Sequence, residues 1–415
     1  MKVRYTHALA AALLFAGCAA AQTFSSGSTG SDGDLIYNTA GTYNFDPTAL
    51  GLDPSGDNIF NFKTIKIASG VTLKLQNSYL RGKPVIWLAT GDVTIAGTLS
   101  LDALGVPSLG SFGADWIDQR QPSQPGPGGF PGGVGARPGT TAYPGLGPGG
   151  APTQTSTSCN VGGSGSFATA GTGTPAAPTY GNIQMVPLIG GSGASGGCVA
   201  STIIATDAAG GTGGAGGGAI RIVSSTSITM TGTISAIGSA GGNGRSGGTY
   251  GGGGSGGAIN LIAPTISGNG SLLVYSEGNG GLGYILLNAA TNTFSGYIPY
   301  LTPTLRPLLA PPLPTLTTTP TVSITKVNGV SVPQPPQGAF QTPDVTINAT
   351  NAVTINISAV GVPVGTVVTL NIQSELGPDQ NISCTPLAGT MDSSTATCSA
   401  SFPTSVSRIL AAASW

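Results

Sequence analysis

The strongest constraint on this chain is an internal repeat of short β-strand patterns separated by glycine. The aligned copies are residues 84–101, 218–236 and 257–274. Each contains runs of four to six residues in which Val, Ile and Thr are frequent and apolar and polar residues alternate. One such unit cannot bury its apolar side chains alone, whereas stacked copies bury a continuous core. The repeat predicts an all-β protein whose first domain, residues 22–300, is a parallel, right-handed β-solenoid. A twisted β-sandwich with glycine-rich loops is the alternative.

Glycine and proline supply 69 and 31 of the 415 residues and gather between these patterns. The runs at 213–218 and 251–257 directly precede aligned strands, so we interpret them as sharp corners between coils. Residues 105–217 form a low-complexity Gly/Pro-rich stretch, which we expect to be an insertion loop in the solenoid. Its composition fits either disorder or polyproline-II-like segments packed against the solenoid.

The C-terminal part of the chain has a different pattern. A Pro-rich segment, 301–320, predicts a stiff linker. Residues 321–415 then alternate with period two and are interrupted by turn residues at short intervals. This pattern predicts an immunoglobulin-like β-sandwich.

The first 21 residues have the features of a signal peptide. Lys2 and Arg4 precede an apolar run and a small-residue cleavage site, Ala19–Ala21. Cys18 has a second interpretation, because the residues before it resemble a lipobox, in which the cysteine is lipidated. Both interpretations predict an exported protein, secreted or on the outer cell surface, and no later segment is apolar enough to span a membrane.

The remaining four cysteines fit an oxidising compartment. They are Cys159, Cys198, Cys384 and Cys398, and they allow three disulfide connectivities. Proximity in the sequence favours Cys159–Cys198 and Cys384–Cys398. A zinc site would need tighter spacing and usually histidine, so we predict no structural metal.

The low charge argues against several functional classes. Charged residues are 7 % of the chain, with 14 basic and 15 acidic, so no basic surface for nucleic acid is expected. The only histidine, His7, lies in the signal segment, which leaves a serine nucleophile without its usual base. A polysaccharide hydrolase or lyase would have to use scattered residues. The candidates are Asp92, Asp102, Asp207 and Glu277, with Arg221 or Arg245 as a base.

Two further motifs suggest binding. Asp53, Asp57 and Asn58 place oxygen atoms at a spacing that suits Ca²⁺, although an Asx-turn is the favoured explanation of these residues. Trp116, between two aspartates in a loop, is a candidate for stacking on a sugar ring, whereas Trp87 lies in an apolar run and is expected in the core.

Two short motifs carry a family resemblance. Residues 217–220 and 256–259 both spell Gly-Gly-Ala-Ile, a motif of adhesin-like β-helix proteins. With Phe45–Pro47, Trp87–Gly91 and 127–133, the chain resembles uncharacterised glycine-rich exported β-helix proteins of soil bacteria with a C-terminal immunoglobulin-like domain. The resemblance implies a surface or secreted β-helix and carries no activity.

We therefore expect a structural or adhesive protein of the cell surface or extracellular space, with no catalytic residues and no cofactor except Ca²⁺ at the loop above. The expected partners are an extracellular polysaccharide or a cell-surface protein. The alternative is a carbohydrate-binding or polysaccharide-degrading β-helix protein.

Overall fold

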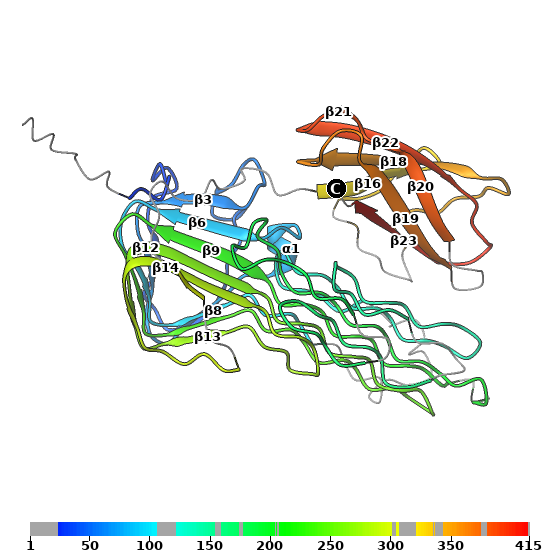
Figure 1. Ribbon diagram of the computed structural model, residues 1–415, viewed down its shortest axis with the longest axis horizontal. Helices are drawn as coiled ribbons and strands as arrows, with labels where there is room; N and C mark the ends of the chain where they lie inside the picture. The colour runs from blue at the N-terminus through cyan, green and yellow to red at the C-terminus, as the bar shows by residue number, and fades with distance from the viewer. Residues whose placement is uncertain are drawn as a thin grey trace, which may run out of the picture.

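The computed structural model describes residues 24–105, 122–153, 159–173, 177–203, 205, 207–300, 304–306, 321–334, 336, 343–374 and 380–413. Within these residues the chain is all-β apart from one short helix, α1 (Asn77–Leu80) (Figure 1). No helix in the described residues is long and apolar enough to cross a membrane.

The N-terminal strands form two parallel sheets. The strands before the glycine-rich segment are β1 (Leu35–Tyr37), β2 (Gly41–Asn44), β3 (Ile59–Phe62), β4 (Ile65–Ile67), β5 (Val71–Lys74), β6 (Val85–Ala89), β7 (Val93–Ile95) and β8 (Thr98–Ser100). Those after it are β9 (Ala219–Ser224), β10 (Ser227–Met230), β11 (Thr233–Ser235), β12 (Ala258–Gly268), β13 (Ser271–Leu273), β14 (Tyr284–Phe294) and β15 (Thr304–Arg306). The ten-stranded sheet has the order β1-β4-β7-β10-β12-β9-β6-β3, with β14 beside β12 and β15 beside β14; the five-stranded sheet has the order β13-β11-β8-β5-β2.

Successive passages of the chain add one strand to each of three parallel ladders. β12 pairs with β9 through its first half and with β10 through its second half, so it joins two of these ladders in one sheet. The core consists of rows of apolar side chains that stay in register from strand to strand. One row is Phe60, Trp87, Ile222, Leu261 and Leu287, all buried. β15 continues this stacking into the segment predicted to be a linker.

The register corrects the sequence alignment by one residue in one strand. Counted from the start of each copy, the alignment sets Trp87 opposite Arg221, but the structure pairs Trp87 with Ile222 and Ile86 with Arg221. A slip of one residue exchanges the two faces of a strand. Trp87 therefore lies in the core between Phe60 and Ile222, and Arg221 lies on the outer face of the sheet.

The glycine-rich residues form a packed bundle of extended segments, here called the glycine bundle: the described residues of 122–217, 236–257 and 276–283. Figure 1 shows these segments running side by side away from the stacked strands. The peptide N–H groups of Phe130, Gly133 and Ala136 donate to the carbonyl oxygens of Gly191, Ala194 and Gly197, at 3.0, 2.8 and 2.9 Å. The carbonyl oxygens of the same three residues accept from the N–H groups of Gly216, Gly213 and Gly210, at 2.9, 2.7 and 2.9 Å.

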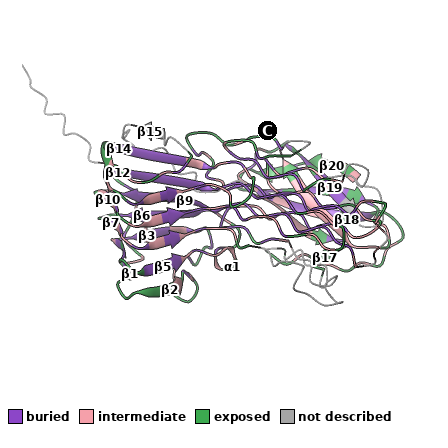
Figure 2. Cartoon of the chain, turned by 90° about the horizontal axis from the view of Figure 1, so that it is seen from below, coloured by how far each residue is buried: buried purple, intermediate pink, exposed green. Residues whose placement is uncertain are grey.

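This bonding has a period of three residues, which is the period of a polyproline-II helix. The same spacing recurs where Gly211, Gly214 and Gly217 donate to Thr249, Gly252 and Ser255. Each segment therefore pairs with several neighbours at once, unlike a strand, which pairs with two. Figure 2 shows that much of the bundle is buried, although Gly is its commonest residue.

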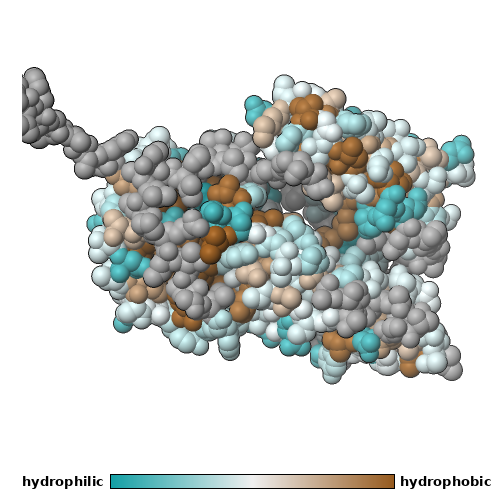
Figure 3. Space-filling view, viewed as in Figure 1, coloured by the Kyte–Doolittle hydropathy of each residue, from teal (hydrophilic) through white to brown (hydrophobic). Residues whose placement is uncertain are grey.

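Glycine is required in the bundle for close approach of backbones. A Cβ atom added to Gly129 would lie 2.7 Å from the carbonyl oxygens of both Gly216 and Gly217. The runs at 213–218 and 251–257 contain no glycine with positive φ, so they are not the sharp corners that we predicted. They are straight segments of the bundle instead. The face of the bundle that Figure 3 shows is largely pale, because glycine, serine and threonine are of intermediate hydropathy.

The C-terminal strands form two antiparallel sheets with a shared core. The strands are β16 (Thr321–Val327), β17 (Val330–Ser331), β18 (Val353–Val360), β19 (Val367–Ser374), β20 (Gln380–Pro386), β21 (Ala388–Thr390), β22 (Ser393–Ala400) and β23 (Ser407–Ala413). The sheet orders are β17-β16-β18-β22-β21 and β20-β19-β23. Ile355 and Ile357 from the first sheet pack in one buried cluster with Leu370 and Ile372 from the second.

Two disulfides bond segments of the described chain, with the pairing that proximity in the sequence favours. Cys159–Cys198 crosses the glycine bundle, with Cα atoms 5.5 Å apart. Cys384–Cys398 connects β20 to β22 and so joins the two C-terminal sheets, with Cα atoms 4.4 Å apart. Both sulfur pairs lie away from the parallel strands.

Removing the inter-sheet disulfide should destabilise the C-terminal sheets alone. The double variant Cys384→Ala/Cys398→Ala should lose about 2 kcal/mol, because the cross-link restricts a short loop of the unfolded chain. Differential scanning calorimetry would detect a lower melting temperature for the C-terminal transition and an unchanged one for the rest. A uniform shift of both transitions would contradict this expectation.

Candidate functional site

The aspartates that were candidates for hydrolysis are occupied by neighbouring hydrogen-bond donors. Asp92 accepts from the hydroxyls of Thr226 at 2.6 Å and Ser227 at 2.8 Å, and these bonds hold the pKa of its carboxyl below the usual value. The carboxylate of Asp102 accepts from Ser100 and Ser235, both at 2.8 Å, and from the N–H of Ile237 at 2.7 Å. Both carboxylates connect consecutive passages of the chain.

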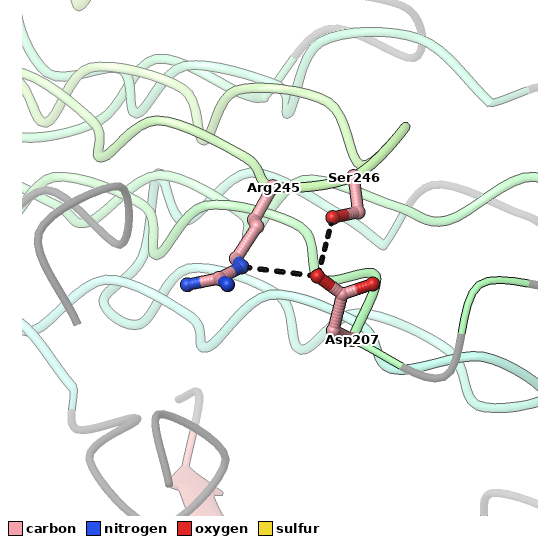
Figure 4. A network of polar contacts seen from close by, with 3 residues as sticks. All are labelled: Asp207, Arg245 and Ser246. Carbon is pink, nitrogen blue, oxygen red and sulfur yellow. Dashed lines mark hydrogen bonds and ion pairs between the residues drawn. The ribbon is translucent and has the colours of Figure 1, made fainter. Parts of the chain in front are cut away.

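Asp207 and Arg245, both partly exposed, pair with each other in the glycine bundle (Figure 4). The Asp207 carboxylate accepts from the Ser246 hydroxyl at 2.7 Å and from Arg245 Nε at 3.3 Å. The Ser246 hydrogen bond is the main reason that the pKa of Asp207 is lowered. Backbone hydrogen bonds also join Ala209 to Arg245, so this cluster fastens two bundle segments together.

Arg221 lies buried on the outer face of the ten-stranded sheet. Met185 and Leu188 belong to the apolar cluster that covers this face. The guanidinium donates from Nη2 to the carbonyl oxygen of Met185 at 2.8 Å, and burial lowers its pKa. No described carboxylate forms an ion pair with it, so the structure does not assemble Arg221 with the aspartates into a lyase-like group.

The loop of the calcium prediction is held by its own hydrogen bonds. The Asp53 carboxylate accepts from the N–H groups of Asp57 and Asn58, each at 3.0 Å, in an Asx-type arrangement. The Asn58 amide donates to the carbonyl oxygens of Leu80 and Lys83, at 2.7 and 3.1 Å. Lys83 Nζ in turn donates to the carbonyl of Gly56, which puts a cation against the same loop.

Asp53 and Asp57 also line a pocket of about 280 Å³ with Asp32 and Asn61. No group of three His, Cys, Asp or Glu side chains in the described residues has an arrangement that would hold a metal ion. Calcium at this loop therefore stays a prediction.

The outer face of the five-stranded sheet carries a column of hydroxyl groups. Its members, here called the hydroxyl column, are Thr42, Thr72, Thr98, Thr233 and Ser271, which pair in register across β2, β5, β8, β11 and β13. Each is followed along its strand by a side chain in or against the core, so its own side chain is on the outer face. None of these hydroxyls makes a hydrogen bond within the described part of the chain.

Three tyrosines, here called the tyrosine cluster, lie at the end of this column. Ser271 pairs with Tyr297, which thus occupies the position of the next rung. Tyr297 and Tyr300 are 64 % and 78 % exposed, and Tyr300 meets the ring of Tyr275 edge-on, with 6.2 Å between ring centroids. Burial, with a smaller contribution from nearby Glu277, raises the pKa of Tyr275.

Sequence analysis missed both features, although one of them left a signal. The aligned repeats contain Thr98-Leu-Ser, Thr233-Ile-Ser and Ser271-Leu-Leu, so the hydroxyl in the first position of each could have been noticed. Trp116, which we chose as the stacking residue, lies outside the described residues, as do Cys18 and the predicted signal peptide.

Comparison of the chain with protein-family models, with curated proteins and with solved structures found no match.

Proposed function

We propose that this chain is an exported, non-catalytic structural or adhesive protein, secreted or held on the outer cell surface. In this proposal the parallel strands form a right-handed β-solenoid, and the C-terminal sheets form an immunoglobulin-like β-sandwich. Cleavage of the signal peptide, or lipidation at Cys18, would release or anchor the protein. No nucleic acid or cofactor has a role.

The observation that carries this proposal is the glycine bundle. Its segments are joined by main-chain hydrogen bonds at every third residue, and a disulfide crosses it. Such bonding depends little on ionised side chains, so the body should keep its shape over a wide range of salt and pH. A long, weakly charged and cross-linked body suits durable contact outside the cell.

An adhesion assay with a parallel enzyme assay tests this proposal. The full chain would be exported into an oxidising compartment, purified, and coupled to beads that are washed over cells and extracellular matrix under flow. We expect beads with folded protein to be retained several-fold better than beads with the heat-unfolded protein, and no release of product from a panel of polysaccharides. Product release that is abolished by Asp102→Asn or Glu277→Gln would overturn the proposal, and so would equal retention of both kinds of bead.

A further inference from the structure

The hydroxyl column is a regular array of unused hydrogen-bonding groups. Neighbouring strands lie about 4.8 Å apart, so the column presents one hydroxyl at each such interval along the stack. On the ten-stranded sheet, Thr226 and Ser227 donate to Asp92. A second row of hydroxyls runs across that sheet through Thr94, Thr229, Ser267 and Thr293, and Thr229 and Ser267 in it are hydrogen-bonded to each other at 3.5 Å. A free threonine hydroxyl can both donate and accept, so the column can pair with either kind of group in a ligand.

The tyrosine cluster adds flat apolar surface at the end of this column. Exposed apolar side chains that gather in one place mark interaction sites, and Tyr297 and Tyr300 are the two most exposed large hydrophobic side chains described. A tyrosine presents a ring face and a polar hydroxyl together. Pyranose rings have the complementary chemistry, since they combine a face of C–H groups with hydroxyls at the edge.

The charges around the face favour a neutral ligand. Asp102 is occupied by its three donors, which leaves exposed Glu277 as the carboxylate beside the tyrosines. Lys74 on β5 is the cation on this sheet, and it stands beside the polar residues Asn44 and Ser100 in the adjacent column. Among the described residues at this face, one exposed carboxylate and one lysine form neither an anion-binding nor a strongly cation-binding surface.

We propose that the outer face of the five-stranded sheet binds an extended, neutral polysaccharide. Tyr297 and Tyr300 stack on sugar rings at one end, and the hydroxyl column hydrogen-bonds to sugar hydroxyls along the stack. This inference rests on the proposed adhesive function and names the class of its ligand. The chain of sugars runs across the strands, which is the direction in which the hydroxyls repeat.

Binding to insoluble polysaccharides tests this inference. The exported full chain would be incubated with microcrystalline cellulose and with chitin, and the bound fraction measured against protein concentration. We expect Tyr297→Ala/Tyr300→Ala to weaken binding about tenfold, or about 1.4 kcal/mol. Thr98→Val/Thr233→Val, which keeps the shape of both side chains, should weaken it several-fold. The matched control is Tyr250→Ala, which removes a 57 % exposed tyrosine from the glycine bundle and should leave binding unchanged.

Melting temperatures equal to that of the natural chain would first show that the variants are folded. Equal binding by all variants, or no binding of the natural chain to either polysaccharide, would overturn the inference. Preference for anionic polygalacturonate, or for a basic peptide, would overturn it in favour of a charge-selective surface. Retention of beads on cells without polysaccharide binding would reject this inference and leave the adhesive function standing.

Discussion

Gly216→Ala should lower the free energy of unfolding by about 3 kcal/mol, because it forces a methyl group between packed backbones. The added Cβ would fall on the carbonyl oxygen of Gly191 and lie 2.8 Å from the peptide nitrogen of Ser192. Gly216 also donates to the carbonyl of Phe130 at 2.9 Å on its other side. A clashing side chain could rotate away, but the atoms that the new methyl group meets are main-chain atoms. Relief of the clash must therefore move the backbone, and this movement breaks hydrogen bonds of the three-residue pattern.

The matched control is Gly105→Ala. A Cβ at Gly105 would meet nothing within 4 Å, and its φ is not in the left-handed region. That substitution should be neutral or stabilise by up to about 1 kcal/mol, because alanine reduces the entropy of the unfolded chain. Urea titration would give the free energies, and hydrogen exchange would locate the effect in residues 190–217. Equal stability of the two variants would show that the glycine bundle does not pack as described.

The apolar rows of the parallel sheets were largely accessible from the sequence. Val93, Ile228 and Ile266 were aligned in the predicted repeat, and they are partners in the structure. The alignment failed only at the strand that begins after Pro84. The alignment put Trp87 and Arg221 at equivalent positions, although one side chain faces the core and the other lies on the outer face of the sheet. Only the register of the paired strands distinguishes these two faces.

The glycine bundle could not be predicted in the same way. Glycines at 126, 129, 132 and 135 do recur every three residues, but other glycines between them hide the period. The partners of this segment lie near 191–197 and 210–216, and a main-chain hydrogen bond leaves no side-chain pattern that would identify them. Low charge and high glycine content were therefore equally compatible with disorder.

The candidate site shows the same limit. Tyr297 and Tyr300 follow the last repeat, in a segment whose prolines and threonines indicated only the approach to a linker. Their place at the end of the hydroxyl column depends on the pairing of Ser271 with Tyr297, which lies outside any regular strand. Asp102 contributes to the raised pKa of Tyr275 because consecutive passages of the chain stack in register.

Trp87→Ala should cost about 4 kcal/mol, the largest loss that we expect from one substitution in the parallel sheets. Trp87 is fully buried, and its ring meets Phe45 and Phe62 edge-on, with centroids 5.4 and 6.0 Å away. Truncation leaves a cavity bounded by rigid aromatic rings and by strands fixed in register. Neighbours that are held in this way cannot collapse into the space, so the cavity term adds to the lost burial.

Trp87→Phe separates packing from polarity at this position. The indole Nε1–H has no hydrogen-bond partner among the described residues, so the natural side chain carries the cost of an unsatisfied buried donor. Phenylalanine removes that donor and keeps an aromatic ring against Phe45 and Phe62, so its net cost should be only about 1 kcal/mol. Calorimetric unfolding of the two variants gives both values. A phenylalanine variant as unstable as the alanine variant would mean that the indole nitrogen is bonded and that its hydrogen bond, rather than ring packing, holds this row of the core.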